Sequence, residues 1–459
     1  MHAHSRMVAH TRRISPGSGM TQPPLCTALQ KCVPDQSELI CLSHPRKHAI
    51  PYRASPGQNG RVRRGLLIVC AALLLAPGGG ASSVPLPTRL ANALAVAGNS
   101  TTASGAVVVD LQTGQLLFAR HPDLPLAPAS NEKLTVSFTA LRELGTSYRF
   151  RTEVFGLGHQ EDGVWHGDVF LKGFGDPTLT SLQLERLATQ IAELGITRIA
   201  GRVYGDESWF DSQRTAPGWK ASFYINECPP LSALIVDRGW YDHHTARQPA
   251  LAAAGRLKLL LREHGVSSGV VGLGRAPDDA YALAQVESDP LPAIVTEMDH
   301  ESDNFMAEML LKTLGAEVGD SGTTIAGAAV VHRDLIAAGV PLAGVRISDG
   351  SGLSLSDRLT ARSLAALLVA VWNDVDLRNP FWASLPIAGI NGTLDKRLRT
   401  PPARGAVRAK TGTTERASAL SGYVRDRYGF AVLQNGWPVR RLSAQKAQDR
   451  FATALAAVP

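Results

Sequence analysis

The segment from Ser130 to Lys133 stands directly before the chain's clearest apolar helix pattern. Pro128 predicts an extended approach, and the apolar residues of 134–144 recur at helical spacing. Residues three apart share one helix face, so we expect the amine of Lys133 to reach the hydroxyl of Ser130. A hydroxyl beside an amine is the arrangement of a nucleophile and its base. Taken alone, the same letters also describe a helix-capping serine followed by a solvated lysine.

The basic balance of the chain is confined to its first 81 residues. The 459 residues carry 47 Lys and Arg against 40 Asp and Glu, a formal net charge of +7. Residues 1–81 hold ten of the basic residues and two of the acidic ones, so the remainder has 37 against 38. A near-neutral remainder carries no electrostatic footprint for nucleic acid, and we expect no nucleic-acid partner.

The same leader has the anatomy of an export signal. Arginines at 61–64 precede an apolar run at 65–76 and a small-residue segment at 77–81. The run of about 12 residues is short for a bilayer-spanning helix. We therefore predict a signal peptide at 61–81 and export to the periplasm or the extracellular cell-wall space, with membrane anchoring if the signal is not cleaved. Residues 1–60 are interpreted as a non-native or disordered leader.

Cysteine and histidine usage gives no sign of a metal site. Four of the five cysteines lie in the leader and only Cys228 follows it, so an internal disulfide is excluded after the leader. Cys228 is interpreted as a structural thiol. The 13 histidines show no H-E-x-x-H or paired metal spacing, and we predict neither a metal nor a cofactor.

Hydrophobic periodicity divides the rest of the chain into three stretches. A hairpin at 105–120 leads into the Ser130 helix, a mixed, strand-rich stretch covers 147–289, and helices and strands then alternate to the C-terminus. The middle stretch is long enough to be a domain of its own. The predicted elements that matter below are strands at 150–155, 167–172, 196–203, 265–274, 280–286, 405–410, 417–424 and 428–434, and helices at 182–194, 306–314, 360–372 and 442–457.

Three short motifs follow one another in a fixed order. They are Ser130-x-x-Lys133, Ser302-Asp303-Asn304 and Lys410-Thr411-Gly412. Each is weak alone, because Ser302 and Asp303 also suit a helix cap and Lys410 a solvated strand end. In this order they resemble the motif set of penicillin-binding proteins and class A β-lactamases.

Further segments narrow the resemblance to one family. The chain resembles the D-alanyl-D-alanine carboxypeptidase/endopeptidase family, the class C low-molecular-weight penicillin-binding proteins. The segments that carry this resemblance are Pro128–Lys133, Gly175–Leu179, Ser302–Glu308, Asp349–Ser354, Asn391–Leu394, Lys410–Thr413 and Ser421–Tyr423. The likeness runs from residue 85 onward. It implies an α+β fold.

The resemblance also implies how the chain is divided into domains. A β-lactamase/transpeptidase-like catalytic domain, an antiparallel sheet flanked by helices, is expected at 84–146 and 290–459. The strand-rich domain at 147–289 is inserted between the first and second motifs.

The resemblance also implies a role for each motif residue. Ser130 is the expected nucleophile, Lys133 its base, and Ser302 the group that passes a proton to the leaving D-alanine amine. The backbone N–H groups of Ser130 and Thr413 are expected to bind the oxyanion. The expected substrate-binding residues are Asn304, Lys410, Thr411, Gly412 and Thr413.

A lysine base requires a displaced pKa. Moving the pKa of Lys133 from about 10.4 to about 7 or 8 takes on the order of 3–5 kcal/mol against the charged form. The helix N-terminus supplies ~0.3–1 kcal/mol, or about 2 when partly buried. Desolvation and the nearby charge of Lys410 must supply the rest, so we expect Lys133 to be buried beside Lys410.

The expected function is that of a serine-type D-Ala-D-Ala carboxypeptidase. Its expected partners are peptidoglycan stem peptides and, as acylating inhibitors, β-lactam antibiotics; peripheral membrane or cell-wall association is a further expectation. Three alternatives stay open at this point. They are an added endopeptidase activity, a β-lactamase or related serine esterase with the same acylation chemistry, and an inactive penicillin-binding or cell-wall scaffold.

Overall fold

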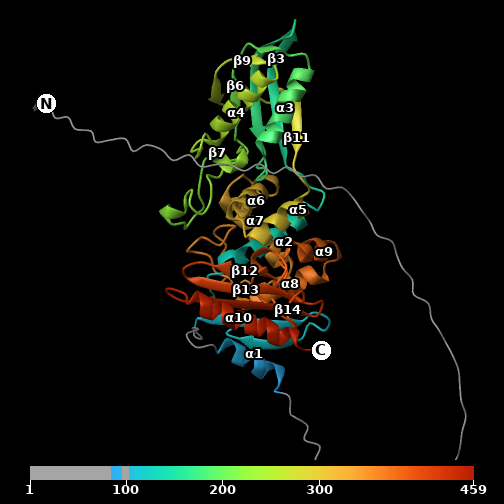
Figure 1. Ribbon diagram of the computed structural model, residues 1–459, viewed down its shortest axis with the longest axis vertical. Helices are drawn as coiled ribbons and strands as arrows, with labels where there is room; N and C mark the ends of the chain where they lie inside the picture. The colour runs from blue at the N-terminus through green and yellow to red at the C-terminus, as the bar shows by residue number, and fades with distance from the viewer. Residues whose placement is uncertain (1–83, 96–102, 459) are drawn as a thin grey trace, which may run out of the picture. The chain divides into compact units, whose positions relative to one another are not determined.

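The computed structural model describes residues 84–95 and 103–458 (Figure 1). These belong to the second of two units of the chain, Gly80–Pro459. The predicted leader at 1–60 and signal at 61–81 lie outside the described residues. Within the described ranges, no helix has both the length and the apolar character that crossing a membrane requires.

The first of two large sheets joins the two ends of the described chain. Its order is β12-β13-β14-β1-β2 and every neighbouring pair is antiparallel. The predicted hairpin at 105–120 is present as β1 and β2, and β1 pairs with β14 from Ser104↔Gln434 to Asp110↔Tyr428. The strands are β1 Ser104–Asp110, β2 Leu116–Arg120, β12 Val407–Thr413, β13 Ala417–Val424 and β14 Tyr428–Asn435.

Helices bury both faces of this sheet. On β13, Leu420 and Val424 belong to the apolar core beneath α1 and α10, whereas Ala419 and Tyr423 belong to the core that includes α2 and α8. This alternation is the two-residue period of a strand covered on both sides. The helices are α1 Leu86–Leu94, α2 Lys133–Glu143, α5 Leu291–Glu301, α6 Asn304–Glu317, α7 Thr324–Ala337, α8 Ala361–Asn373, α9 Val375–Ser384 and α10 Arg441–Ala456.

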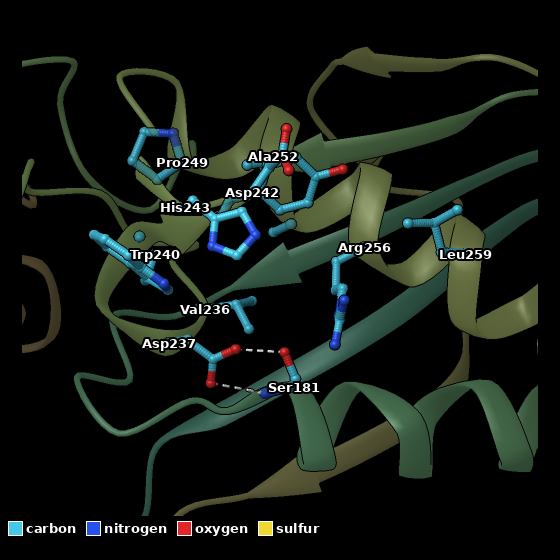
Figure 2. Close-up of a pocket in the computed structure, with 13 residues that line it drawn as sticks. Ser181, Val236, Asp237, Trp240, Asp242, His243, Pro249, Ala252, Arg256 and Leu259 are labelled. Carbon is cyan, nitrogen blue, oxygen red and sulfur yellow. Dashed lines mark hydrogen bonds between the residues drawn. The ribbon is translucent and has the colours of Figure 1, made fainter. Parts of the chain in front are cut away.

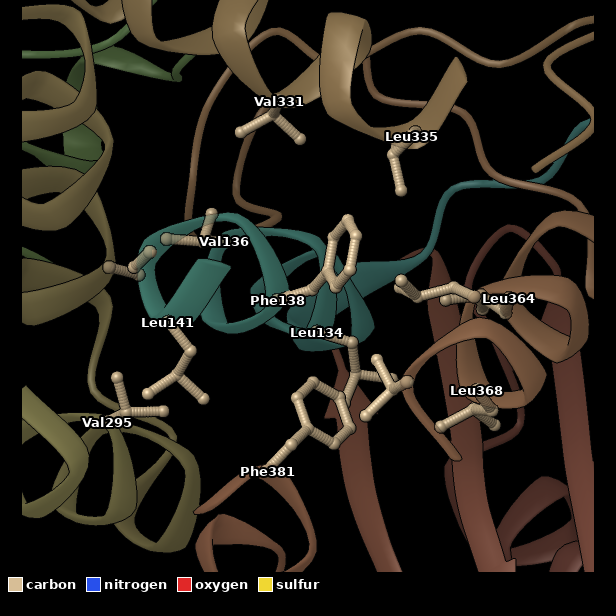
Figure 3. Close-up of a cluster of buried hydrophobic side chains, with 14 of the residues drawn as sticks. Leu134, Val136, Phe138, Leu141, Val295, Val331, Leu335, Leu364, Leu368 and Phe381 are labelled. Atoms are coloured by element: carbon tan, nitrogen blue, oxygen red, sulfur yellow. The ribbon is translucent and has the colours of Figure 1, made fainter. Parts of the chain in front are cut away.

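Helix α2 lies at the centre of the second of these cores. Figure 3 shows Leu134, Phe138 and Leu141 pointing from α2 toward side chains of α5, α7, α8 and α9. Because α6 also packs on α2, the helix is enclosed on several sides and the turn at its N-terminus is held firmly in place.

The second sheet is built from the stretch between the first and second motifs. Its main order is β10-β6-β4-β3-β11, with β5 and β9 attached, and it mixes parallel and antiparallel pairs. Helices α3 and α4 pack on it over an apolar core. The elements of the sheet and its helices are β3 Arg151–Glu161, β4 Val164–Gly173, α3 Ser181–Glu193, β5 Arg198–Ile199, β6 Val203–Asp206, α4 Pro249–Glu263, β9 Ser267–Ser268, β10 Val271–Leu273 and β11 Tyr281–Glu287. A separate two-stranded sheet is formed by β7 Trp240–Tyr241 and β8 His244–Thr245.

Three predicted strands differ from the observed ones. The strand predicted at 196–203 is divided into β5 and β6, because Gly201 crosses so close to Gly167 that a Cβ would lie 2.2 Å from its carbonyl oxygen. The strand predicted at 265–274 is likewise divided into β9 and β10. The strand predicted at 405–410 runs instead from 407 to 413, since its pairing with β13 continues to Thr413↔Ser418.

Candidate active site

The Ser130 motif forms a tight turn rather than the first turn of a helix. Ser130 lies in the 3₁₀ turn η1, Ala129–Glu132, and α2 starts at Lys133. Ala129 has a φ of 48° and begins the turn in the left-handed region. The turn still brings the two side chains together, with 3.1 Å between Lys133 Nζ and Ser130 Oγ. Ser130 is half-buried, so its hydroxyl is open to a ligand while Lys133 is fully enclosed.

Lys133 makes two further hydrogen bonds. Its Nζ lies 2.9 Å from Asn304 Oδ1 and 2.8 Å from the carbonyl oxygen of Ser351. Burial lowers the pKa of Lys133, and the nearby carboxyl groups, Asp349 foremost, act in the opposite direction. The expected burial of Lys133 is therefore present, together with a pKa displaced in the direction that a base needs.

Lys410 and Ser302 form a second pair beside the first. Lys410 Nζ, fully buried on β12, donates to Ser302 Oγ at 2.8 Å and to its neighbour's carbonyl oxygen on Thr411 at 3.2 Å. Ser302 joins α5 to α6 with a φ of 58°. Burial lowers the pKa of Lys410 to about 7, assisted by the charge of Lys133 and opposed by Asp299. The charge of Lys133 thus acts on the pKa of Lys410, whereas the largest influences on the pKa of Lys133 are burial and the neighbouring carboxyl groups.

The remaining two residues of the second motif start helix α6. Asp303 Oδ1 accepts from the backbone N–H of Met306 at 2.8 Å, so Asp303 is the N-cap. Asn304 Nδ2 donates to the carbonyl oxygen of Glu227 at 3.1 Å. That bond leaves the amide oxygen of Asn304 turned toward Lys133.

The third motif lies on β12, directly against the Ser130 turn. A Cβ at Gly412 would lie 2.8 Å from the carbonyl oxygen of Pro128 and 3.2 Å from the backbone nitrogen of Asn131. Asn131 Nδ2 donates to the carbonyl oxygen of Lys410 at 3.0 Å, which ties the turn to the strand. Glycine is needed at 412 because any side chain would push the two segments apart.

The two threonines of this strand lie at different depths. Thr411 is buried and its Oγ1 is 2.8 Å from Thr393 Oγ1, whereas Thr413 is exposed at the end of β12. Thr393 belongs to the segment Asn391–Leu394 that the sequence marked only as family-like.

A cluster of buried carboxyl groups behind the lysines was not predicted. Glu308 Oε1 accepts from the backbone N–H groups of Gly350 at 3.1 Å and Ser351 at 2.9 Å. It therefore fixes the backbone on the N-terminal side of Ser351, while Asp349, which accepts from the N–H of Gly352, holds the peptide group whose carbonyl oxygen accepts from Lys133. Burial raises the pKa of Glu308 to about 8, and the neighbouring Asp349 adds to the rise. The fully buried carboxyl groups of this cluster are Glu132, Asp299, Glu308, Asp349 and Asp357.

Asp349 is more than the turn residue that its sequence context indicated. Its carboxylate accepts from the backbone N–H groups of Gly352 and Ser354, both at 2.7 Å, and from Trp219 Nε1 at 2.8 Å. The turn chemistry of Asp-Gly-Ser-Gly was visible in the sequence, but its contact with Trp219, 130 positions away, was not.

The stretch between the first two motifs also reaches the site. Besides Trp219 and Glu227, Lys220 contributes an ion pair of 2.7 Å with Glu415, just beyond the third motif. Cys228 is a buried free thiol in a small apolar cluster with Phe305 of α6. A cavity of about 480 Å³ opens beside these residues, next to Gly352 and Thr414. In the part of the chain that the structure describes, no group of three or more His, Cys, Asp or Glu is arranged to hold a metal ion.

Comparison with known proteins identifies relatives across most of the chain. The model of the D-Ala-D-Ala carboxypeptidase 3 (S13) family matches residues 86–252 and 242–458. A D-alanyl-D-alanine carboxypeptidase of an Actinomadura species is 31% identical over 418 residues, which cover 72% of this chain and 78% of that protein. A carboxypeptidase of Mycobacterium tuberculosis is 33% identical over 377 residues, covering 76% and 79%.

Solved structures agree on the fold. The crystal structure of penicillin-binding protein 4 from Haemophilus influenzae has a TM-score of 0.71 at 21% identity and covers 81% of this chain and 98% of that chain. The predicted α+β, transpeptidase-like fold is confirmed, as are the family resemblance and the assignment as a serine-type carboxypeptidase. The chain belongs to the D-Ala-D-Ala carboxypeptidase 3 (S13) family.

Proposed function

We propose that Ser130 is the nucleophile of a D-Ala-D-Ala carboxypeptidase and Lys133 its general base. One observation carries this proposal, the set of three partners around Lys133 Nζ. Asn304 Oδ1 and the carbonyl oxygen of Ser351 only accept hydrogen bonds. A neutral amine uses its two protons for these acceptors and keeps its lone pair for the third partner, the Ser130 hydroxyl. This pattern suits a base that is ready to take a proton.

Acylation of Ser130 by the substrate is followed by hydrolysis of the acyl-enzyme. Ser130 Oγ attacks the carbonyl carbon between the two terminal D-alanines of a stem peptide while its proton passes to Lys133. The backbone N–H groups of Ser130 and Thr413 stabilise the oxyanion, at about 3 kcal/mol per donor. The C–N bond breaks, and the D-alanine amine leaves with a proton delivered by Ser302, which is restored by the proton that Lys133 took from Ser130. Water then attacks the acyl-enzyme and releases the shortened peptide, returning the proton to Ser130.

Substrate recognition rests on the third motif. Lys410 supplies the positive charge for the terminal carboxylate, with the hydroxyls of Thr411 and Thr413 assisting. Gly412 allows β12 to approach Ser130 closely, and Asn304 holds the amide of the substrate as well as Lys133. The cavity of about 480 Å³ is large enough for the acyl side of a peptide and lies within the usual range of ~300–1,000 Å³.

The proposed partners are peptidoglycan stem peptides and β-lactam antibiotics. A β-lactam complex is known for Haemophilus influenzae penicillin-binding protein 4, the relative compared above. Action on the cell wall agrees with a place outside the cytoplasm. Export through 61–81 and association with the membrane are further parts of this proposal, as are a catalytic domain at 84–146 and 290–459 and an inserted domain at 147–289.

Covalent trapping with penicillin tests the proposal. The full chain is incubated with benzylpenicillin, and the intact mass is measured over time for the wild type, Ser130→Ala and the exposed control Ser212→Ala. Ring opening releases no atoms, so the expected adduct equals the mass of the whole drug in wild type and Ser212→Ala and is absent from Ser130→Ala. D-alanine release from a stem pentapeptide should follow the same pattern.

Other outcomes point to the alternatives. Rapid turnover of the drug without an adduct that persists indicates a β-lactamase. The absence of both adduct and D-alanine release indicates a scaffold. Release of peptide from crosslinked stems, measured beside D-alanine release, gives the endopeptidase share.

A further inference from the structure

A second cavity, of about 380 Å³, lies in the strand-rich stretch between the first and second motifs (Figure 2). Its walls come from the turn η3, Asp237–Gly239, the β7–β8 hairpin, the start of α3 and one side of α4. The volume falls within the range of ~300–1,000 Å³ of small-ligand pockets. No role in the chemistry described above uses this cavity.

The lining of this cavity combines an aromatic surface with both donors and acceptors. Figure 2 shows Trp240 and His243 on one side, Arg256 across from them, and Asp237 at the base. Asp242 adds a second carboxylate. Two carboxylates and one guanidinium give a small formal charge, so the lining favours an uncharged polar ligand over a strongly anionic one.

Several of these groups are available to a ligand. Trp240 is 60% exposed although it lies in a strand. Among the described residues, neither the Arg256 guanidinium nor the Asp242 carboxylate has a hydrogen-bond or ion-pair partner in the protein. Asp237, in contrast, is fixed, because it accepts from the backbone N–H of Ser181 at 3.1 Å and from the Ser181 hydroxyl.

One residue connects this cavity to the active site. Arg238 stands between two lining residues, Asp237 and Gly239, and has a φ of 56°. Its guanidinium donates to Asp303, the middle residue of the second motif, and lies over the ring of Phe305. A left-handed backbone conformation is unfavourable for arginine and persists only where neighbouring contacts stabilise it. At Arg238 the ion pair with Asp303 is such a contact. A single turn therefore joins the cavity to Asp303 of the second motif.

We propose that this cavity binds an N-acetylated amino-sugar unit of the glycan strand that carries the stem peptide. A sugar ring presents an apolar C–H face, which suits the Trp240 indole, and hydroxyl and acetamide groups that both donate and accept hydrogen bonds. Asp242 accepts, and Arg256 donates. The inference rests on the proposed function, because that function requires a substrate attached to such a strand.

Binding of a defined oligosaccharide tests the inference. A β-1,4-linked tetramer of N-acetylglucosamine is titrated into the full chain, and the dissociation constant is measured by calorimetry and by saturation-transfer NMR. Trp240→Ala and Arg256→Ala should each weaken binding by about tenfold, as expected from the loss of one stacking or hydrogen-bonding anchor. Lys258→Ala is the matched control, because it removes a cation from the same helix outside the cavity, and should bind as the wild type does.

A kinetic comparison gives a second readout. The KM for a disaccharide-linked pentapeptide should be lower than that for the free pentapeptide, and Trp240→Ala should abolish the difference while leaving hydrolysis of the free peptide unchanged. Equal tetramer binding by wild type and Trp240→Ala, no binding at millimolar tetramer, or tighter binding of the free peptide at this cavity would each overturn the inference.

These results are separable from a failure of the proposed function. Penicillin acylation of Ser130 is measured on the same preparations and does not involve the cavity. Sugar binding without acylation removes the catalytic proposal alone. Acylation without sugar binding removes only the inference about the cavity.

Discussion

The two large sheets of the described chain differ in how much charge is buried beside them. The core over α3 and α4 on the seven-stranded sheet consists of Leu, Ile, Val, Ala and one Trp. Beside the five-stranded sheet, Lys133, Lys410 and five fully buried carboxyl groups stand next to the apolar core of α2. The described part of the seven-stranded region also buries carboxyl groups, at Glu153, Asp176 and Asp206, but no lysine. Burying charge costs free energy unless each group is paired, so such a cluster is kept where its chemistry is used.

The contrast indicates that side chains beside the seven-stranded sheet mainly stabilise the fold, whereas the buried charged side chains beside the five-stranded sheet serve the reaction. In the seven-stranded region, substitutions are expected to change stability and leave the rate of acylation alone. Around the five-stranded sheet, substitutions of the buried charges are expected to change the rate first. Four substitutions test that division, and their expected effects on acylation decrease in the order given.

Lys133→Met should have the largest effect. Removing the general base is expected to slow penicillin acylation by about a thousandfold. Because the buried lysine is held against its preference for water, the melting temperature should stay the same or rise. Acylation rates from intact mass and calorimetric melting measure both effects. Lys258→Met on α4 is the control, and a clear fall in the melting temperature of Lys133→Met alone would mean that Lys133 is mainly structural.

Lys410→Ala is expected to lower kcat/KM for a D-alanyl-D-alanine peptide by about a hundredfold, because the terminal carboxylate loses its charged partner.

The pH dependence of kcat/KM of the wild type also tests the role of Lys410. With the pKa of Lys410 at about 7, its charge is lost as pH rises through that value, while Lys133 loses its basicity as pH falls. The profile should be bell-shaped and belong to the lysine pair. An alkaline limb that stays flat to pH 10 would contradict this assignment.

Glu308→Ala should slow acylation by about tenfold. The substitution removes the acceptor for the N–H groups of Gly350 and Ser351, so the Ser351 carbonyl oxygen no longer holds Lys133 in place. Glu308→Gln keeps an acceptor oxygen and should remain within about twofold of the wild type. Equal losses in the Ala and Gln variants would show that the charge of Glu308, and not its hydrogen bonds, is what matters.

Leu257→Ala should not change acylation at 25 °C. Leu257 is fully buried in the core of the seven-stranded region, so its truncation is expected to cost about 2–5 kcal/mol in the free energy of unfolding. Chemical denaturation measures this cost, and Leu182→Ala, 59% exposed on α3, should fall within about 0.5 kcal/mol of the wild type. If folded Leu257→Ala is acylated slowly, the expected separation of stability effects from rate effects between the two regions is wrong.

The sequence predicted the elements better than their edges. Periodicity marked α2, α3, β13 and β14 closely, because each buries a regular stripe or alternating face. Periodicity misplaced the ends of β12, which are set by its pairing with β13. It also predicted β5 and β6 as one strand, which is interrupted where the backbone passes close to another strand. Such contacts are set by residues far away in the chain.

The same limit applies to the site. The three motifs predicted which residues meet, since each has a local signature and a fixed order. Glu308 ends the family-like segment Ser302–Glu308, but its role could not be predicted, because its partners, Gly350 and Ser351, lie on another segment. Arg238 and Trp219 reach the site from the intervening stretch, where nothing in the local pattern distinguishes them from surface residues.

The active site can form only after β1 has paired with β14 during folding. Ser104 faces Gln434 across the central ladder, so the sheet that supports Lys410 closes only after nearly the whole chain is available. Contacts between such distant parts of a sequence form slowly. We therefore expect a growing chain to react with β-lactam only after the C-terminal hairpin has joined the N-terminal one, because Lys410 reaches the Ser130 turn through that sheet.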